Sequence, residues 1–202
     1  MSVPAQRSEV GTRRWRGVIA LAPVALDAAL MVRVEELLAK NGLKVTEWFH
    51  ASLRLLLLER QLEEAAYFLP KIAARQPPFK IRVTGTAFFP SAGALILKVQ
   101  PSAILRKLRR EILLQQGWPD VLVWLRNLTW IPHISAAYGV GENGWSLAHT
   151  LAAIVHGQEA LVEQITLRDW RDQDRCYQLG SGKESCIPLA NTECSGESVR
   201  AG

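Results

Sequence analysis

The chain is poor in cysteine and lacks any long apolar run, and each shortage excludes a class of protein. Its 202 residues contain three cysteines, Cys176, Cys186 and Cys194, with no C-x-x-C pair. An odd and badly spaced set of this kind argues against a disulfide framework and against a zinc knuckle. No window reaches the roughly 18 uncharged apolar residues of a membrane span, and the N-terminal region does not resemble a secretory signal. We therefore expect a soluble, cytoplasmic protein.

Size and charge set broader limits. The chain is 49% hydrophobic and carries a formal net charge of +5. The positive charge weakly favours anionic partners. Its length suffices for one substantial core. From about Asn191 the composition turns small and polar. We expect a single domain over residues 15–190, between a flexible N-terminus at 1–14 and a disordered tail at 191–202.

Hydrophobic periodicity predicts interleaved strands and helices. Pro70 is expected to kink or end the second helix, and Ser102 and Ser146 are expected to cap later ones. Because strands often follow one another directly, the pattern predicts an α+β fold with antiparallel pairing. The expected strands cover 14–23, 48–58, 80–90, 93–100, 121–125, 129–139, 161–170 and 175–179, and the expected helices cover 24–42, 59–69, 103–116 and 147–157.

Two of the predicted strands share a short pattern. One reads WFHASLR and the other WIPHISA, so that a serine stands two residues after a histidine in both. Successive side chains of a strand alternate between its faces, so His50, Ser52 and Arg54 share one face, as do His133 and Ser135. Only 19 of the 202 residues are serine or threonine, so two such pairs among four histidines are unexpected by chance. Each site alone could be a histidine satisfied in the core or exposed at a sheet edge, but together they indicate a repeated functional element.

The two segments, HASL at 50–53 and HISA at 133–136, resemble the paired H-x-[ST]-x signatures of the 2H phosphoesterase superfamily, which contains 2′-5′ RNA ligases and cyclic nucleotide phosphodiesterases. Both hydroxyl positions are serine here, whereas threonine is commoner in that family. The resemblance covers about residues 15–180. It implies a bilobal fold of two antiparallel sheets, with outer helices around a central cleft and one motif strand from each lobe.

The residue types themselves suit phosphodiester chemistry. Two imidazoles can act as general base and general acid near neutral pH, and serine hydroxyls can donate hydrogen bonds to the phosphate oxygens. We therefore expect His50 and His133 to be catalytic and Ser52 and Ser135 to bind phosphate, with a weaker case for Arg54. No metal or cofactor is required. The resemblance implies a monomeric, metal-independent enzyme whose substrates are RNA or small nucleotides with a 2′,3′-cyclic phosphate or a 2′-5′ linkage. The alternative is a noncatalytic RNA- or nucleotide-binding module that keeps the cleft.

Other features have simpler interpretations. The arginines of the basic run at 105–112 are expected on a solvated outer face, because Leu105, Leu108 and Ile112 form the apolar stripe of that helix. Tyr138 has the opposite parity to His133, which predicts a core position. His149 and His156 are two helical turns apart without further ligands in the sequence, so both are expected to be structural.

Overall fold

The computed structural model describes residues 17–21, 26–46, 51–56, 58–169 and 174–186. The predicted terminal segments at 1–14 and 191–202 lie outside this range. The helices are α1 (Ala28–Lys40), α2 (Glu59–Arg75), α3 (Ala103–Gln115), α4 (Asp120–Leu128) and α5 (Gly144–Val155), with a short 3-10 turn, η1 (Pro90–Ala92). The strands are β1 (Gly17–Leu21), β2 (Ala51–Leu56), β3 (Phe79–Phe89), β4 (Ala94–Val99), β5 (His133–Ala137), β6 (Glu159–Val162), β7 (Gln164–Asp169), β8 (Arg175–Gln178) and β9 (Glu184–Cys186).

The strands form one antiparallel sheet in the order β6-β3-β4-β5-β2-β1-β7-β8-β9. The α+β class is confirmed, but the expectation of two separate sheets is wrong. The reason is that β5 pairs with β4 on one side and with β2 on the other. We call β6, β3, β4 and β5 the β5 half of the sheet, and the remaining strands the β2 half. The two lobes implied by the motifs are thus halves of a continuous sheet.

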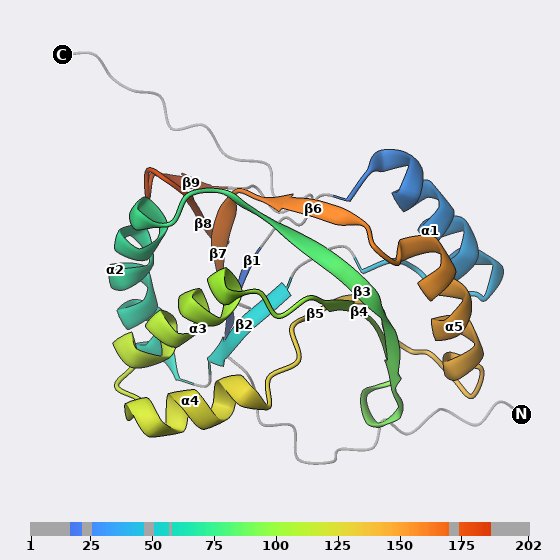
Figure 1. Cartoon of the computed structure of the whole chain (residues 1–202), viewed down its shortest axis with the longest axis horizontal. Coiled ribbons are helices and arrows are strands. Elements are labelled where there is room, and N and C mark those ends of the chain that lie inside the picture. The colour runs from blue at the N-terminus through green and yellow to red at the C-terminus, as the bar shows by residue number, and fades with distance from the viewer. Residues whose placement is uncertain (1–16, 22–25, 47–50, 57, 170–173, 187–202) are drawn as a thin grey trace, which may run out of the picture.

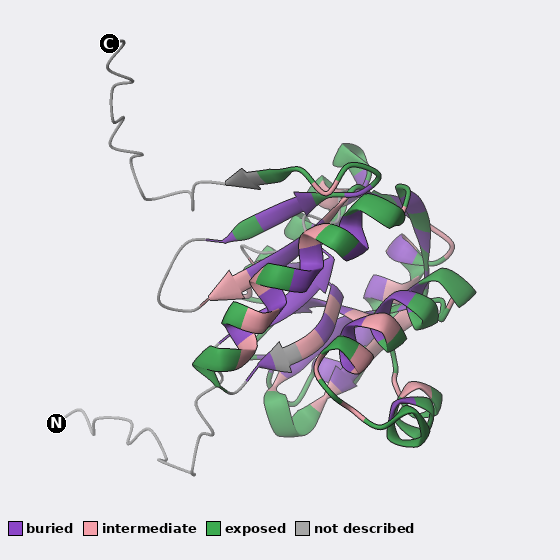
Figure 2. Ribbon diagram, turned by 90° about the vertical axis from the view of Figure 1, so that its left-hand side faces the viewer, coloured by how far each residue is buried: buried purple, intermediate pink, exposed green. Residues whose placement is uncertain are grey.

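The helices cover the two halves separately. α5 packs on β3 and contacts α1, whereas α2 packs on β7 and β8 and contacts α3, which in turn carries α4. Figure 1 shows α1 and α5 at one end of the molecule and α2, α3 and α4 at the other. In Figure 2 the strands are mostly buried, and exposed residues gather on the outer sides of the helices. No helix among the described residues is both long and apolar enough to cross a membrane.

Alternation of apolar and polar residues explains which face of a strand enters the core. In β3, Phe79, Ile81 and Val83 are buried, while the residues between them are exposed. Further along the same strand, the Thr86 hydroxyl donates a hydrogen bond to the Ala148 carbonyl of α5 and fixes that helix on the sheet. The periodicity of the sequence therefore predicts this part of the fold correctly.

The second helix continues past the proline that was expected to kink or end it. α2 runs to Arg75 with Pro70 in its interior. Proline removes one backbone donor, but the helix buries Phe68, Leu69 and Ile72 against the sheet, and this burial outweighs the local preference. Tertiary packing therefore sets the length of α2.

Two other local expectations are also wrong. Residues 121–125, expected as a strand, lie in α4, where Asp120 occupies the first turn after Pro119 and only Val123 is buried. Ser146 lies inside α5, which begins at Gly144, and its predicted cap does not form. By contrast, Ser102 caps α3 as expected, because its hydroxyl accepts a hydrogen bond from the Leu105 amide at 3.2 Å.

Close packing of Gly182 against α2 generates a stability prediction. Gly182 has φ +66°, and an added Cβ would lie 2.3 Å from the Pro70 carbonyl oxygen. Gly42 has a similar φ of +70° with nothing within 4 Å of its Cβ position, so it is the matched control. We expect Gly42→Ala to lower the free energy of unfolding by about 1 kcal/mol, through backbone conformation alone. Gly182→Ala should cost about 1 to 3 kcal/mol more, because it adds overpacking.

Urea unfolding of both variants and the parent chain measures the difference. Equal losses of unfolding free energy for Gly42→Ala and Gly182→Ala would show that a methyl group at position 182 causes no overpacking against the Pro70 carbonyl.

Candidate functional site

The two H-x-S segments lie side by side where the halves of the sheet meet. Ala51, the first residue of β2, is the antiparallel partner of Ile134 in β5. Ser52 follows Ala51 and His133 precedes Ile134 along the chain, so both residues adjoin this pair. His50 immediately precedes Ala51 in the sequence, but it lies outside the described residues. The structure therefore brings Ser52, His133 and Ser135 to one region, and the position of His50 stays a prediction.

His133 has a defined ring orientation. Its Nδ1 lies 2.9 Å from the Ile131 carbonyl oxygen, and its half-buried ring meets Phe89 edge to face with centroids 5.7 Å apart. Because a carbonyl oxygen only accepts, the contact requires the hydrogen to be on Nδ1. In the neutral ring Nε2 then carries the lone pair, and among the described residues it has no hydrogen-bond partner. This arrangement suits a base that accepts a proton through Nε2.

Ser135 is almost fully buried, with 8% of its surface exposed, and its backbone and side chain are both held. Its carbonyl accepts a hydrogen bond from the Thr46 hydroxyl at 2.8 Å, and its own hydroxyl oxygen accepts one from the Tyr138 hydroxyl at 2.9 Å. Since the lone pair toward Tyr138 is used, the Ser135 hydrogen is left to donate elsewhere. This geometry suits a donor to a phosphate oxygen.

The structure corrects the prediction that Tyr138 is a core residue. Its side chain is 55% exposed. β5 ends at Ala137, so strand parity no longer fixes the direction of Tyr138, and its ring turns back toward Ser135. The sequence gives one indication of this contact, because Tyr138 stands only three residues after Ser135.

The structure contradicts the prediction that Arg54 shares a face of its strand with Ser52. In the pairing of β2 with β1, Ser52 lies opposite Ala20 and Arg54 opposite Ile19, so the register shifts at Leu53 and the two side chains no longer point the same way. Its Nε donates to the Gln116 side-chain oxygen at 3.1 Å, and its guanidinium lies 4.9 Å from the centre of the Trp118 ring. Burial, followed by the charge of Arg126, lowers the pKa of Arg54 below its ordinary value. Arg54 is thus held beside the motif region, and no described contact links it to His133.

Arg109 contradicts the expectation that all arginines of the basic run are solvated. It is 8% exposed. Its guanidinium donates to the Leu53 carbonyl at 3.2 Å, to the Arg126 carbonyl at 3.2 Å and to the Asn127 side chain. Burial, with smaller contributions from Arg54 and Arg126, lowers the pKa of Arg109 to about 10. No sequence pattern distinguishes Arg109 from its neighbours, because its partners lie on β2 and α4.

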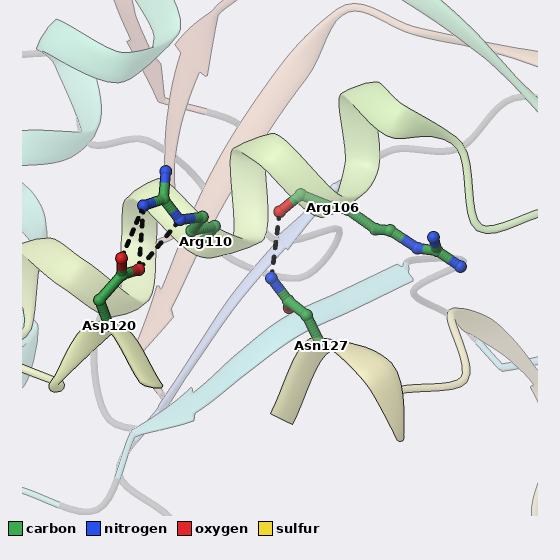
Figure 3. A network of polar contacts seen from close by, with 4 residues as sticks. All are labelled: Arg106, Arg110, Asp120 and Asn127. Atoms are coloured by element: carbon green, nitrogen blue, oxygen red, sulfur yellow. Dashed lines mark hydrogen bonds and ion pairs between the residues drawn. The ribbon is translucent and has the colours of Figure 1, made fainter. Parts of the chain in front are cut away.

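The rest of the basic run faces outward, as expected. Arg106, Lys107 and Arg110 line a groove of about 710 Å³ between α3 and α4, together with Val121, Trp124 and Leu128. Arg110 holds both carboxylate oxygens of Asp120, and the Asn127 amide donates to the Arg106 carbonyl at 3.3 Å (Figure 3). Of the H-x-S residues that the structure describes, which are Ser52, His133 and Ser135, none lines this groove. Its polar contacts therefore fix α4 on α3.

The remaining histidines show no role at this site. His156 places Nδ1 3.0 Å from the Thr84 carbonyl, and His149 is exposed on α5. Within the part of the chain that the structure describes, no three His, Cys, Asp or Glu side chains gather as metal ligands.

Comparisons with known proteins bear on the same region. A family model described as the 2′-5′ RNA ligase superfamily matches residues 25–174. A putative phosphoesterase, GK0864, of Geobacillus kaustophilus (strain HTA426) is 32% identical over 80 residues, which is 38% of this chain and 42% of that protein. In this match the chain spans less than half the length of the curated relative.

Among solved structures, TT0787 of Thermus thermophilus matches with a TM-score of 0.52 and 20% identity, over 85% of this chain and 94% of that one. The E. coli LigT structure complexed with 3′-AMP matches with a TM-score of 0.47 and 16% identity, over 87% of this chain and 94% of that one. The Thermus likeness shows a shared fold.

The His133 contact generates a spectroscopic prediction. We expect long-range ¹H–¹⁵N spectra recorded above the titration range of histidine to show His133 as the Nδ1–H tautomer, because the Ile131 carbonyl accepts that hydrogen. His156, which has an analogous contact to Thr84, should show the same tautomer. Exposed His149 is the comparison without such a contact. A dominant Nε2–H form at His133 would contradict the orientation described above.

Proposed function

Because the chain belongs to the 2′-5′ RNA ligase superfamily, we propose that it is a metal-independent phosphodiesterase acting on RNA-type substrates. The family match confirms the resemblance inferred from the two motifs. The proposed reactions are hydrolysis of 2′,3′-cyclic phosphate ends to 2′-phosphates and the making or breaking of 2′-5′ linkages. The observation that carries the proposal is the pairing of Ala51 with Ile134, which sets the two H-x-S segments side by side.

In the proposed hydrolysis, one histidine takes a proton from water while the water oxygen forms a new bond to phosphorus. The bond from phosphorus to the 3′ oxygen breaks, and the other histidine gives a proton to that oxygen. The lone pair of His133 Nε2 supports its part in these transfers, with His50 proposed as the second group. The two histidines exchange roles between the forward and the reverse reaction. Two imidazoles supply both proton transfers, so the proposal needs no metal.

The serines are proposed to hold the non-bridging phosphate oxygens. Charge must be stabilised there in the transition state, and hydroxyl donors that are already oriented do so without reorganisation. The Tyr138 contact supports this role for Ser135, because it directs the serine hydrogen away from the tyrosine. Ser52, which follows Ala51 on the neighbouring strand, is proposed to contribute the second donor, and Arg54 to add positive charge near the phosphate.

A noncatalytic module that binds RNA or nucleotides is the second candidate. The adjacency of the motif segments suits a binding cleft as well as a catalytic one. The two candidates differ in whether the parent chain turns over a cyclic phosphate at all, and, if it does, mutation tests whether both histidines are needed.

Loss of either histidine should nearly abolish turnover. On a 2′,3′-cyclic nucleotide in the presence of EDTA, we expect His50→Ala and His133→Ala each to lower kcat by on the order of 10²- to 10⁴-fold, the contribution of a positioned proton-transfer group. The double variant should be far less impaired than the product of the two effects, because the residues act as one unit. Ser52→Ala and Ser135→Ala should cost less, since proton transfer is retained.

His149→Ala is the control, because this histidine is exposed on α5 and makes no described contact with Ser52, His133 or Ser135. Near-normal kcat in folded His50→Ala and His133→Ala proteins would reject the paired-histidine mechanism. Nucleotide binding without any turnover in the parent chain would favour the binding module. Activity that disappears in EDTA and returns with added zinc or magnesium would reject metal independence.

Tyr138 should assist catalysis through Ser135. We expect Tyr138→Phe to lower kcat about 3- to 10-fold, the effect of losing one hydrogen bond that orients the serine. In a Ser135→Ala background the same substitution should have little further effect, because there is no hydroxyl left to orient. Tyr67→Phe is the matched control, since Tyr67 is exposed on α2. Full additivity of Tyr138→Phe and Ser135→Ala would show that Tyr138 acts by another route.

A further inference from the structure

Helix α4 presents apolar residues to solvent instead of to the core. Among the described residues thirteen large apolar side chains are exposed, and six of them fall within residues 121–131. Five of the six belong to α4, and we call them the α4 face: Val121, Leu122, Trp124, Leu125 and Leu128. A single exposed apolar residue is ordinary, but a contiguous patch of them marks a surface that a partner covers.

The α4 face is continuous around the helix. At about 100° per residue, its five side chains fall within about half of the helical circumference. The other half holds Val123, which is buried, and Asp120 and Asn127, whose side chains bind Arg110 and Arg106 of α3. Figure 1 shows α4 at the edge of the molecule, beyond α3. The helix therefore turns its polar contacts inward and its apolar residues outward, which reverses the usual arrangement of a surface helix.

Positive charge borders the α4 face on both sides. Arg126 follows Leu122 by one helical turn, and Arg106, Lys107 and Arg110 stand across the groove on α3. All four basic residues are exposed. Among the described residues, Arg106, Lys107 and Arg126 form no ion pair.

The carboxylates of the two helices do not offset this charge. α3 and α4 together carry five basic and two acidic residues. Each acidic residue is already held by an arginine, Asp120 by Arg110 and Glu111 by Arg75. The surface is therefore apolar in the middle and positive along both borders, so it fits an occupant that is both apolar and negatively charged.

The shape and charge of this surface distinguish four kinds of occupant. A second copy of the chain would bring two sets of unpaired cations together, because a two-fold interface uses the same patch twice. A nucleic acid would meet the cations but leave the α4 face in water. An acidic helix seated in the groove would cover Val121, Trp124 and Leu128 and leave Leu122 and Leu125 exposed. A bilayer with anionic lipids covers the whole face and places phosphates beside both rows of cations.

We propose that the α4 face docks the protein reversibly on a membrane surface that contains anionic phospholipids. The apolar side chains enter the boundary between head groups and acyl chains, while Arg106, Lys107 and Arg126 contact lipid phosphates. Trp124 suits this depth, because its ring is apolar and its indole N–H can donate to a head group. With nine residues, α4 lies on the membrane and does not cross it.

Vesicle sedimentation tests the proposal and needs no turnover. The full chain is mixed with vesicles of phosphatidylcholine alone, or of phosphatidylcholine and phosphatidylglycerol in equal amounts. We expect it to bind the mixed vesicles, and to bind the neutral ones at least about tenfold more weakly, because the cations lose their partners there.

Two matched pairs of variants localise the contact. Trp124→Ser and Trp145→Ser each remove an exposed tryptophan, with 60% and 62% of its surface exposed, from α4 and from α5 at the other end of the molecule. We expect Trp124→Ser to weaken binding to the mixed vesicles about tenfold and Trp145→Ser to bind like the parent chain. Arg106→Glu should also weaken binding about tenfold, whereas Arg33→Glu, at an exposed position on α1, should have little effect. Circular dichroism checks that each variant is folded.

Three results would overturn the proposal. The first is failure to bind the mixed vesicles, or an equal loss in Trp124→Ser and Trp145→Ser. The second is a stable dimer in light scattering that Trp124→Ser dissociates, because a second copy then covers the α4 face. The third is a chain that ignores the vesicles but binds a synthetic helix with glutamates on one side and leucines on the other. None of these results bears on the proposed phosphodiesterase activity, which is measured separately.

Discussion

The short contact between β2 and β5 is the constraint on which the rest of the structure depends. Among the described residues, Ala51 and Ile134 are the one pair of partners that joins the two strands. Further along β2, the Leu53 carbonyl accepts a hydrogen bond from the Arg109 side chain. Because buried carbonyls need partners, this bond helps to satisfy the backbone of β2 beside the point where the two strands separate. The sheet stays continuous, yet its halves diverge beside the motifs.

The site that results is ordered by contacts that orient donors and acceptors. The Ile131 carbonyl fixes the His133 ring, and the Tyr138 hydroxyl fixes that of Ser135. Thr46 also holds β5. Its hydroxyl donates to the Ser135 carbonyl, and its amide donates to the Ala136 carbonyl. Ile131 and Tyr138 lie within a few residues of the second motif, whereas Thr46 is far from it in the sequence. Such supporting contacts allow short polar side chains to keep one geometry in an open region.

Sequence periodicity predicted the α+β class and most strands, because alternation and helical spacing follow directly from burial. It failed where burial and pattern disagree. Residues 121–125 are apolar but largely exposed in α4, and Pro70 lies inside α2 because the turns around it pack on the sheet. Arg109 looked like its solvated neighbours, since its partners come from distant elements. One sheet was taken for two because register between distant strands is not encoded locally. The position of His50, the second proposed catalytic group, stays a prediction.

The path of the chain through the sheet adds a kinetic consequence. β1 lies between β2 and β7, so its second neighbour is separated from it by most of the polypeptide. During synthesis on the ribosome, β1 and β2 emerge early, but the edge of β1 stays open until Gln164–Asp169 has left the exit tunnel. Nonlocal pairing of this kind slows folding and leaves an unpaired strand edge exposed to other chains. Completion of the β2 half, and with it the support of one motif strand, therefore has to wait for the synthesis of β7.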